Sequence, residues 1–310
     1  MRPIPAAAAA AALVLCAAAP AAQALTLADR YSSISFLGDS LSDTGNAFAL
    51  SGGAFGGPPY FDGRFSDGPL WSDLVSAAFA PTAVANAAVG GATVLANATF
   101  PGNDLDGQRA LYDSLVANPL FGFGPRPVLA IWIGANDVGA GNDMAAAAAR
   151  VTAEVADLSV TYGIMDFLVP DLPDLGKWPG ALAGGPVASA GATFLSELYN
   201  TALFAGLDAL EAGTPGLQIT RVRTADLFDA VLADPGGFGM PQGAAPCYIE
   251  GVFLCTDPED RVFFDPIHPS STMHALIAGA VEATVIPIPA TLPLLAAAAA
   301  GLLLLRRRAA

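Results

Sequence analysis

Basic residues are scarce in this chain of 310 residues, which has 13 lysines and arginines against 28 aspartates and glutamates. Four of the 13 are arginines near the two ends, at position 2 and positions 306–308. Without them, nine basic residues oppose 28 acidic ones, so the body carries a formal charge of −19. Because such a surface repels a polyanion, the composition argues against nucleic acid as a partner.

Cysteine and histidine are also rare. Beyond the N-terminal apolar segment the cysteines are Cys247 and Cys255, eight residues apart, and the two histidines are His268 and His274. No histidine or third cysteine lies near the cysteine pair to complete a metal site. We therefore expect a disulfide between Cys247 and Cys255 that closes a loop in an oxidising compartment.

The N-terminus has the pattern of a secretory signal. A positive charge at Arg2 precedes an apolar stretch, and small residues at positions 22–24 offer a cleavage site before Leu25. Cys16 is not expected to be a lipoprotein cysteine, since a large leucine precedes it. We expect residues 1–24 to be removed as a signal peptide.

The C-terminus, residues 286–310, reads "IPIPATLPLLAAAAAGLLLLRRRAA". Its apolar part reaches the length of about 20 residues that spans a bilayer, and the arginines would stay on the cytoplasmic side. Motif, apolar span and basic cluster resemble the PEP-CTERM type of bacterial sorting signal, in the variant with Val-Pro-Leu-Pro-Ala. The resemblance implies export across the inner membrane, transient anchoring there, and an exosortase-like sorting machinery as partner. The mature protein is then expected in the cell envelope or outside the cell.

The body, residues 25–285, is predicted to be one α/β domain. Short β-branched runs alternate with Ala/Leu-rich helical stretches, which is typical of a parallel sheet with helices on both faces. The strands lack polar alternation, as strands buried on both faces should. Expected strands are Ile34–Leu37, Val84–Asn86, Val128–Ile133, Thr161–Val169 and Gln218–Arg223. Expected helices are Leu70–Phe79, capped by Ser66 or Asp67, Leu105–Ala117, Met144–Leu158, Ala190–Ala212 and Ser270–Ala283.

Small and polar residues follow three of these strands. Ser40 comes after the first, Gly90 and Gly91 after the second, and Asn136 and Asp137 after the third. Ligands of parallel α/β sheets bind beyond the carboxyl ends of the strands, so we expect these residues to line one crevice.

A serine nucleophile needs an imidazole to take its proton and an acid to orient that imidazole. His268 lies in "FFDPIHPSS" with Asp265 three residues before it, and this pair can supply both groups. His274 has no comparable acidic partner and falls inside a predicted helix, so we expect it to have a packing role.

Four short blocks, in order, resemble the GDSL esterases and lipases of the SGNH hydrolase superfamily. They are "GDSLSDTGN" at 38–46, "NAAVGGA" at 86–92, "GAND" at 134–137 and "DPIHP" at 265–269. The segment "YFDGRFSDGPLWSDLV" resembles the subgroup of secreted lipases and lecithinase-like phospholipases. The resemblance covers about residues 33–283. A Gly-x-Ser-x-Gly elbow is absent because position 42 is serine, which disfavours the α/β-hydrolase fold.

The resemblance implies a flavodoxin-like three-layer α/β/α fold and ester hydrolysis through an acyl-enzyme, with a lipid or small acyl ester as substrate. It assigns Ser40 as nucleophile, His268 as base and Asp265 as the orienting acid. The oxyanion donors would be the amides of Ser40 and Gly91 and the side chain of Asn136. Gly90 is an alternative to Gly91 because the glycine pair permits a shift of one residue.

Asp39 and Asn46 match residues that brace the first loop in the family. No metal or organic cofactor is implied. Two other functions share this pattern: an acyltransferase on the same triad, and a non-catalytic protein of the envelope or matrix.

Overall fold

The computed structural model describes residues 25–286. The predicted signal peptide, residues 1–24, lies outside the described residues, as does the predicted sorting signal beyond Ile286. Within the described range, no helix is both long enough and apolar enough to cross a membrane.

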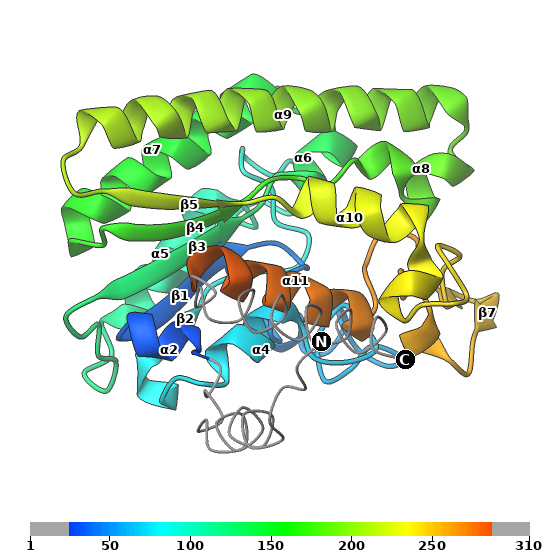
Figure 1. Ribbon diagram of the computed structural model, residues 1–310, viewed down its shortest axis with the longest axis horizontal. Helices are drawn as coiled ribbons and strands as arrows, with labels where there is room; N and C mark the ends of the chain where they lie inside the picture. The colour runs from blue at the N-terminus through cyan, green and yellow to red at the C-terminus, as the bar shows by residue number, and fades with distance from the viewer. Residues whose placement is uncertain (1–24, 287–310) are drawn as a thin grey trace, which may run out of the picture.

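A sheet of five parallel strands in the order β2-β1-β3-β4-β5 forms the centre of the fold (Figure 1). The strands are β1 (Ser33–Gly38), β2 (Val84–Asn86), β3 (Pro127–Trp132), β4 (Asp166–Pro170) and β5 (Gln218–Val222). β2 lies on one side of β1 and β3 on the other, so the strand order reverses there. In open parallel sheets the ligand crevice lies beyond the strand ends at such a reversal.

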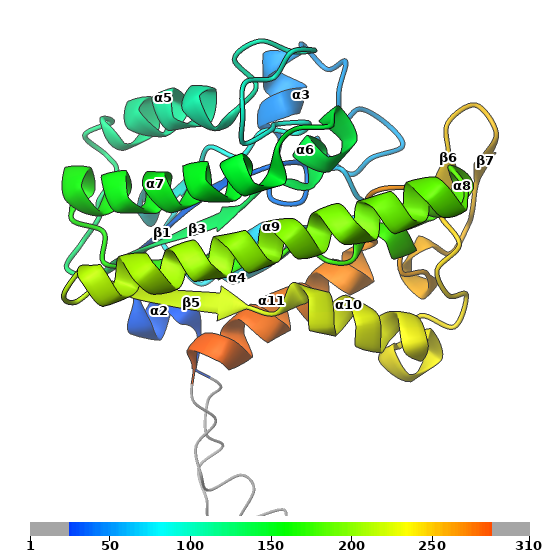
Figure 2. The ribbon, with the colours of Figure 1, turned by 90° about the horizontal axis from the view of Figure 1, so that it is seen from above.

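Helices cover both faces of the sheet, which makes the fold the predicted three-layer α/β/α sandwich (Figure 1, Figure 2). One face carries α5 (Leu105–Val116), α7 (Met144–Tyr162) and α9 (Pro186–Gly213); the other carries α2 (Leu27–Arg30), α4 (Trp71–Ser76), α10 (Thr224–Ala233) and α11 (Ser271–Val285). Along β3, Ile131 packs into the core on the first face, whereas Ala130 and Trp132 pack into the core on the second. Because both faces are buried, the strands show no polar alternation.

Several short elements are absent from the sequence prediction. They include α3 (Asn46–Leu50), α6 (Ala135–Ala140), α8 (Pro179–Ala183) and the 3₁₀ turns Pro81–Ala83, Leu175–Lys177, Pro235–Phe238 and Pro258–Asp260. α2 and α10 were not predicted either. Isolated helices this short are marginal in water, so tertiary packing rather than local propensity forms them.

The predicted strand Thr161–Val169 is wrong in its first part. α7 continues through Tyr162 and ends at Gly163, whose φ of 67° is the left-handed conformation that glycine adopts readily. The β-branched Val160 and Thr161 favour a strand by propensity alone, and the packing of α7 on the sheet overrides that preference.

Two helix starts also differ from prediction. α9 begins earlier than expected, at Pro186, because proline suits the first turn of a helix. Neither Ser66 nor Asp67 is the N-cap of α4. Leu70 precedes that helix and donates its N–H to the carboxylate of Asp73 at 2.9 Å.

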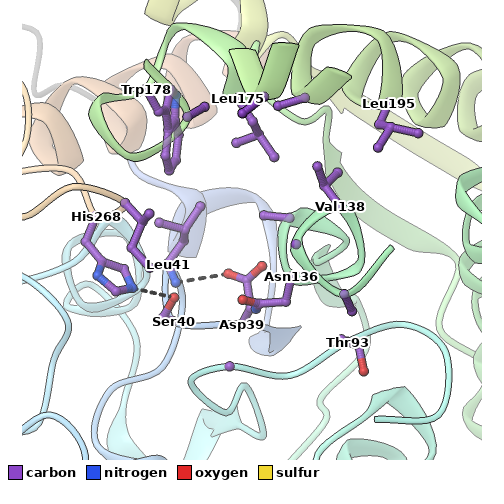
Figure 3. A pocket seen from close by; sticks show the side chains of 18 of the residues that line it. Asp39, Ser40, Leu41, Thr93, Asn136, Val138, Leu175, Trp178, Leu195 and His268 are labelled. Carbon is purple, nitrogen blue, oxygen red and sulfur yellow. Dashed lines mark hydrogen bonds between the residues drawn. The ribbon is translucent and has the colours of Figure 1, made fainter. Parts of the chain in front are cut away.

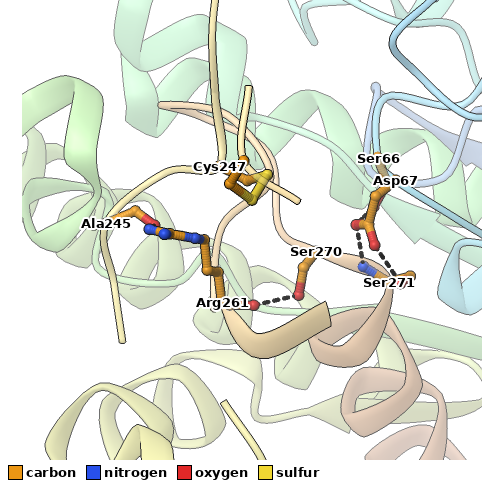
Figure 4. The surroundings of a disulfide bond; sticks show 8 residues. Ser66, Asp67, Ala245, Cys247, Arg261, Ser270 and Ser271 are labelled. Atoms are coloured by element: carbon orange, nitrogen blue, oxygen red, sulfur yellow. Dashed lines mark hydrogen bonds between the residues drawn. A yellow bond between two sulfur atoms is a disulfide. The ribbon is translucent and has the colours of Figure 1, made fainter. Parts of the chain in front are cut away.

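Ser66 and Asp67 instead join their loop to the loop that carries His268 (Figure 4). The carboxylate of Asp67 accepts hydrogen bonds from the N–H and the Oγ of Ser271, at 2.8 and 2.7 Å, where α11 begins. The hydroxyl of Ser66 donates to the carbonyl of Pro269 at 2.9 Å. These bonds fix the segment that follows His268.

A disulfide joins Cys247 to Cys255, the pair singled out in the sequence (Figure 4). It closes the hairpin of β6 (Tyr248–Ile249) and β7 (Phe253–Leu254). The N–H of Cys247 donates to the carbonyl of Phe263 at 3.2 Å, so the hairpin lies against the segment that leads to Asp265.

Candidate active site

Ser40 lies in a tight turn directly after β1. The N–H of Asp39 donates to the carbonyl of Trp132, and the carbonyl of Asp39 accepts from the amides of Ser42 and Asp43. The Asp39 carboxylate also accepts from the N–H of Leu41 at 3.0 Å. These bonds hold the turn while the Ser40 side chain faces the cleft (Figure 3).

Ser40, His268 and Asp265 form a continuous hydrogen-bonded chain. Nε2 of His268 lies 2.8 Å from Oγ of Ser40, and Nδ1 lies 2.6 Å from Oδ2 of Asp265. The serine and the histidine are 228 positions apart in the sequence. The fold brings them together because Ser40 follows the carboxyl end of β1 and His268 lies in the loop before α11. All three residues are largely buried, with 3 to 8% of their surface exposed.

Asp265 also shapes the loop that presents the imidazole. Its Oδ1 accepts from the amides of Ile267 and His268, both at 2.8 Å. Burial by itself raises the pKa of Asp265, but the charge and hydrogen bonds of His268 and the amide of Ile267 outweigh it and lower that pKa below its ordinary value. An ionised Asp265 holds the proton on Nδ1, which leaves the Nε2 lone pair free to accept from Ser40.

Two aromatic residues complete the surroundings of the histidine, and the sequence did not assign them a role. The hydroxyl of Tyr60 donates to Oδ2 of Asp265 at 2.7 Å. The ring of Phe65 lies across the imidazole of His268, with centroids 5.2 Å apart and planes at 31°. Both belong to the segment "YFDGRF". The resemblance of this segment to the family is the one feature of the sequence that indicates a role in the site.

The two glycines after β2 have different environments, and the difference favours Gly91 as the oxyanion donor. The N–H of Gly90 donates to the carboxylate of Asp43 at 2.7 Å, and a Cβ on Gly90 would lie 2.2 Å from the Phe65 ring. Gly90 is therefore needed for packing. The N–H of Gly91 has no acceptor among the described residues, and Gly91 lines the cleft with a φ of 77°.

The other two predicted donors line the same cleft. The amide of Ser40 makes no hydrogen bond to another described residue, so it is free to bind an oxyanion. Nδ2 of Asn136, at the start of α6, donates one hydrogen to the carbonyl of Ala92 at 2.9 Å. That bond orients the side-chain amide and leaves its second hydrogen available. The structure thus brings Ser40, Gly91 and Asn136 to one cavity, where donors can meet a developing negative charge.

Asn46, one of the two predicted bracing residues, and Asp43 tie the first motif block to the second. Asn46 donates from Nδ2 to the carbonyls of Asn86 and Ala88 at 2.9 and 2.8 Å. Asp43 accepts four backbone amides, from Gly45, Asn46, Ala47 and Gly90. These bonds fix the first block against the second.

Two further acidic side chains near the crevice, those of Asp39 and Asp137, are buried and accept hydrogen bonds from backbone amides. Asp137 is fully buried and accepts from the amides of Val94 and Leu95. Asp39 is also buried, and this desolvation raises its pKa to about 7.

His274 has the packing role that the sequence indicated. It is fully buried in α11, and its Nδ1 accepts from the N–H of Trp71 at 3.4 Å. Burial lowers its pKa to about 3, so the imidazole is neutral near neutral pH.

The cleft over Ser40 has two lobes. The first, of about 690 Å³, is the α9 lobe (Figure 3); its wall includes Leu175, Trp178, Val187, Ala188, Gly191 and Leu195. The second, of about 670 Å³, is the α5 lobe; its wall includes Ala47, Leu50, Phe55, Phe65, Phe100 and Leu111. Six residues line both lobes: Ser40, Gly91, Phe100, Asn136, Ile267 and His268. The candidate catalytic groups therefore lie where the lobes meet.

No group of three or more histidine, cysteine, aspartate or glutamate side chains within residues 25–286 is placed to hold a metal ion.

A family model described as GDSL-like lipase/acylhydrolase matches residues 34–281. The chain belongs to this family. The family assignment drawn from the four sequence blocks is thus confirmed. Membership supports an enzyme that acts on ester bonds.

Relatives of this GDSL-family protein carry esterase and acyltransferase names. A phosphatidylcholine-sterol acyltransferase of Aeromonas hydrophila is 32% identical over 225 residues, which cover 70% of this chain and 66% of that protein. An acetylesterase of Thermothelomyces thermophilus is 28% identical over 171 residues, 53% of this chain and 51% of that one. The matches thus span less than two thirds of these relatives. The crystal structure of a GDSL-like lipase from Parabacteroides merdae aligns with a TM-score of 0.50 at 13% identity, covering 82% of this chain and 95% of that chain, and it shares the fold.

Proposed function

We propose that this protein is a serine esterase or lipase that hydrolyses acyl esters through a covalent intermediate on Ser40. The observation that carries the proposal is the chain of contacts from Ser40 Oγ to His268 Nε2 at 2.8 Å and from His268 Nδ1 to Asp265 Oδ2 at 2.6 Å. A nucleophile within hydrogen-bond reach of a base that a carboxylate orients is the arrangement needed for nucleophilic catalysis.

In the acylation half, Oγ of Ser40 attacks the carbonyl carbon and its proton passes to Nε2 of His268. The carbonyl oxygen takes the electron pair and accepts from the amides of Ser40 and Gly91 and from Nδ2 of Asn136. Collapse of this intermediate breaks the bond to the alcohol oxygen, and the imidazolium gives that oxygen its proton. The ionised Asp265 stabilises the imidazolium while it exists.

In the second half, water replaces the alcohol. His268 takes a proton from the water as its oxygen attacks the acyl-enzyme carbonyl, and the same donors hold the oxyanion. Collapse of this second intermediate breaks the bond between the acyl carbon and Oγ of Ser40, the imidazolium returns its proton to Oγ, and the acid is released.

The direct test is covalent labelling with a fluorophosphonate together with hydrolysis of p-nitrophenyl acetate. The purified protein should label at Ser40, and Ser40→Ala should lose both the label and the turnover. Ser114→Ala, on an exposed position of α5, is the matched control and should retain both. A wild-type protein that neither labels nor hydrolyses the ester would favour the non-catalytic envelope or matrix role instead.

A second candidate is acyl transfer from the same acyl-enzyme to an alcohol. The similarity to a protein named phosphatidylcholine-sterol acyltransferase supports it. Product analysis with and without an added alcohol separates the two functions, because a transferase forms a new ester in water whereas a hydrolase releases only the acid.

We also propose that the protein is exported and sorted at the inner membrane. The signal-like residues 1–24, the PEP-CTERM-like residues 286–310 and a disulfide between Cys247 and Cys255 support this proposal. Intact-mass measurement of envelope material from the native host should give a chain that begins near Leu25 and ends near Pro289 or Ala290. A full-length chain in the cytoplasm would contradict it.

A further inference from the structure

The candidate active site opens into two cavities of nearly equal size rather than one. The volumes of the α9 lobe and the α5 lobe, about 690 and 670 Å³, each fall within the range of about 300–1,000 Å³ typical of clefts and cavities that bind small molecules. Neither lobe is a side branch of the other, since they share only the six residues at the junction. A site for an ester with one short arm needs only one such cavity.

An ester has two arms, and both begin at the reacting group. For attack by Ser40 the carbonyl carbon must lie about 3 to 3.5 Å from Oγ. The acyl chain leaves that carbon in one direction and the alcohol leaves it, through the ester oxygen, in another. Because Ser40, His268, Gly91 and Asn136 all line both lobes, an ester held at the junction has one lobe open to each arm.

The walls indicate the chemistry of both arms. Within the described chain, the titratable side chains that line the lobes are those of Asp39 and His268, and no lysine or arginine does. A phosphate or sulfate on either arm would meet no cation there, whereas such groups are usually recognised by arginine or lysine. Leucine, valine, alanine, phenylalanine and tryptophan make up half of the lining residues of the two lobes, and these apolar side chains favour alkyl or ring groups.

One side of α9 forms part of the wall of the α9 lobe. The first half of α9 contributes Val187, Ala188, Gly191 and Leu195 to the wall, a spacing that places them along one side of the helix. Two of the four are alanine and glycine. A Cβ on Gly191 would meet no atom within 4 Å, so the space beside this turn is open.

We propose that the substrate is an uncharged ester with two apolar arms, one bound in the α9 lobe and the other in the α5 lobe. The proposal rests on the proposed esterase function and narrows its substrate class to esters of an apolar acid with an apolar alcohol. It excludes esters whose alcohol is a phosphorylated or charged headgroup seated in either lobe.

The experiment uses two series of uncharged esters on the purified protein, with acid release as the readout. In the acid series the alcohol stays ethanol while the acid lengthens from acetate to octanoate. In the alcohol series the acid stays acetate while the alcohol lengthens from ethanol to octanol. The wild-type kcat/KM should rise along both series, by up to about fourfold for each methylene that becomes buried.

Each of two variants narrows one lobe. Gly191→Phe places a ring in the α9 lobe, and Leu111→Trp enlarges the wall of the α5 lobe. The readout is the ratio of kcat/KM for the longest and shortest ester within a series, so a general loss of activity cancels. One variant should lower this ratio at least tenfold in the acid series only, and the other in the alcohol series only.

Matched controls lie on the same helices outside the cleft. Gly213→Phe, at the far end of α9, also meets open space, and Leu115→Trp lies one turn beyond Leu111 on α5. Both should give the wild-type ratios. If circular dichroism shows that a lobe variant is unfolded, Val187→Trp and Leu50→Trp replace it, because these wall residues are 88% and 71% exposed.

Three results would overturn the proposal: a wild-type increase in only one series, both lobe variants acting on the same series, or no effect of either on its ratio. These failures differ from failure of the esterase function itself, in which the wild type hydrolyses no ester and Ser40 takes no fluorophosphonate label. In that case both proposals fall together.

Discussion

The hydroxyl of Tyr60 donates to Oδ2 of Asp265 at 2.7 Å, the same oxygen that lies 2.6 Å from Nδ1 of His268. Asp265 thus accepts a tyrosine hydroxyl and an imidazole N–H on one oxygen and two backbone amides on the other. A carboxylate with this many donors is held in one orientation and stays ionised. Tyr60 therefore acts on the site through Asp265, as a positioning residue.

Tyr60→Phe removes that donor while keeping the ring that packs against Tyr248 and Phe264. A hydrogen bond to a charged group contributes about 1.5–3 kcal/mol, so we expect kcat/KM for a short ester to fall by about tenfold or more if the carboxylate is released from its position. Tyr248→Phe is the matched control. Its hydroxyl makes no hydrogen bond within residues 25–286, and its activity should stay near the wild-type level. Equal activities of the two variants would refute the positioning role.

Substitutions of the two histidines should affect ester turnover differently, because His268 lies in the cleft and His274 lies in the core. His268→Ala should abolish ester turnover, since no other imidazole is near Ser40. His274→Gln keeps an acceptor for the N–H of Trp71 and should retain most of the turnover. Both proteins should be checked by circular dichroism. Turnover that survives in His268→Ala would remove this residue as the base.

Asn136→Ala separates oxyanion stabilisation from folding. Loss of one oxyanion donor typically lowers kcat by about 100- to 1,000-fold, whereas the lost bond to the carbonyl of Ala92 costs about 1 kcal/mol of stability. The variant should therefore fold, label slowly at Ser40 and lose most of its turnover. Asn142→Ala loses a comparable bond, to Asp137 at 2.7 Å, outside the cleft and should turn over normally. An Asn136→Ala activity within threefold of wild type would contradict the donor role.

Asp39 predicts a pH dependence of stability. Its pKa rises from an ordinary value of 3.8 to about 7 in the folded protein because the carboxyl group is buried. Between these values the folded state binds a proton that the unfolded state has released, so the free energy of unfolding falls as pH rises.

Asp39→Asn removes this dependence while keeping an acceptor for the amide of Leu41. Between the two pKa values, Asp39 by itself lowers the free energy of unfolding by about 1.4 kcal/mol for each pH unit of increase, and the variant lacks this contribution. Relative to wild type, the melting temperature of the variant should therefore rise by several degrees between pH 4 and pH 8. The quantity to measure is the difference in melting temperature between variant and wild type as a function of pH. The cost of burying the amide introduced at position 39 does not change with pH, so it shifts this difference by a constant and leaves its slope unchanged. A difference that stays constant over this range would show that Asp39 is not the group that titrates.

Much of the candidate site was predictable from the sequence because its groups are chemically specific. An imidazole with an aspartate three residues away, a serine after a buried strand and an asparagine after another strand each follow from local patterns. The parallel order of the strands then brings their carboxyl ends together, so Ser40, Gly91 and Asn136 share one cavity. Side-chain chemistry and strand order were therefore enough to place Ser40, Asn136 and the glycine pair at one edge of the sheet, and the family resemblance assigned their roles.

Some features of the site could not be predicted from local sequence patterns, because they depend on contacts between segments that are far apart in the chain. Tyr60 and Asp265 are 205 positions apart, and no spacing rule links them. The choice between Gly90 and Gly91 depends on the carboxylate of Asp43, which occupies the Gly90 amide. Asp67 was expected to cap α4 but binds Ser271 at the start of α11 instead. In each case the partner comes from another part of the chain.

Three features follow from the sequence alone: the fold class, the carboxyl end of each strand to within one residue, and the residue types available for nucleophilic catalysis. Hydrophobic periodicity and side-chain chemistry are local properties, and the order of residues carries them completely. Three other features become visible only in the folded protein: the backbone amides that remain free, the tyrosine that binds Asp265, and the division of the cleft into two lobes at Ser40. These features depend on how side chains from segments far apart pack against one another, and that packing exists only once the sheet and its two helical layers have closed.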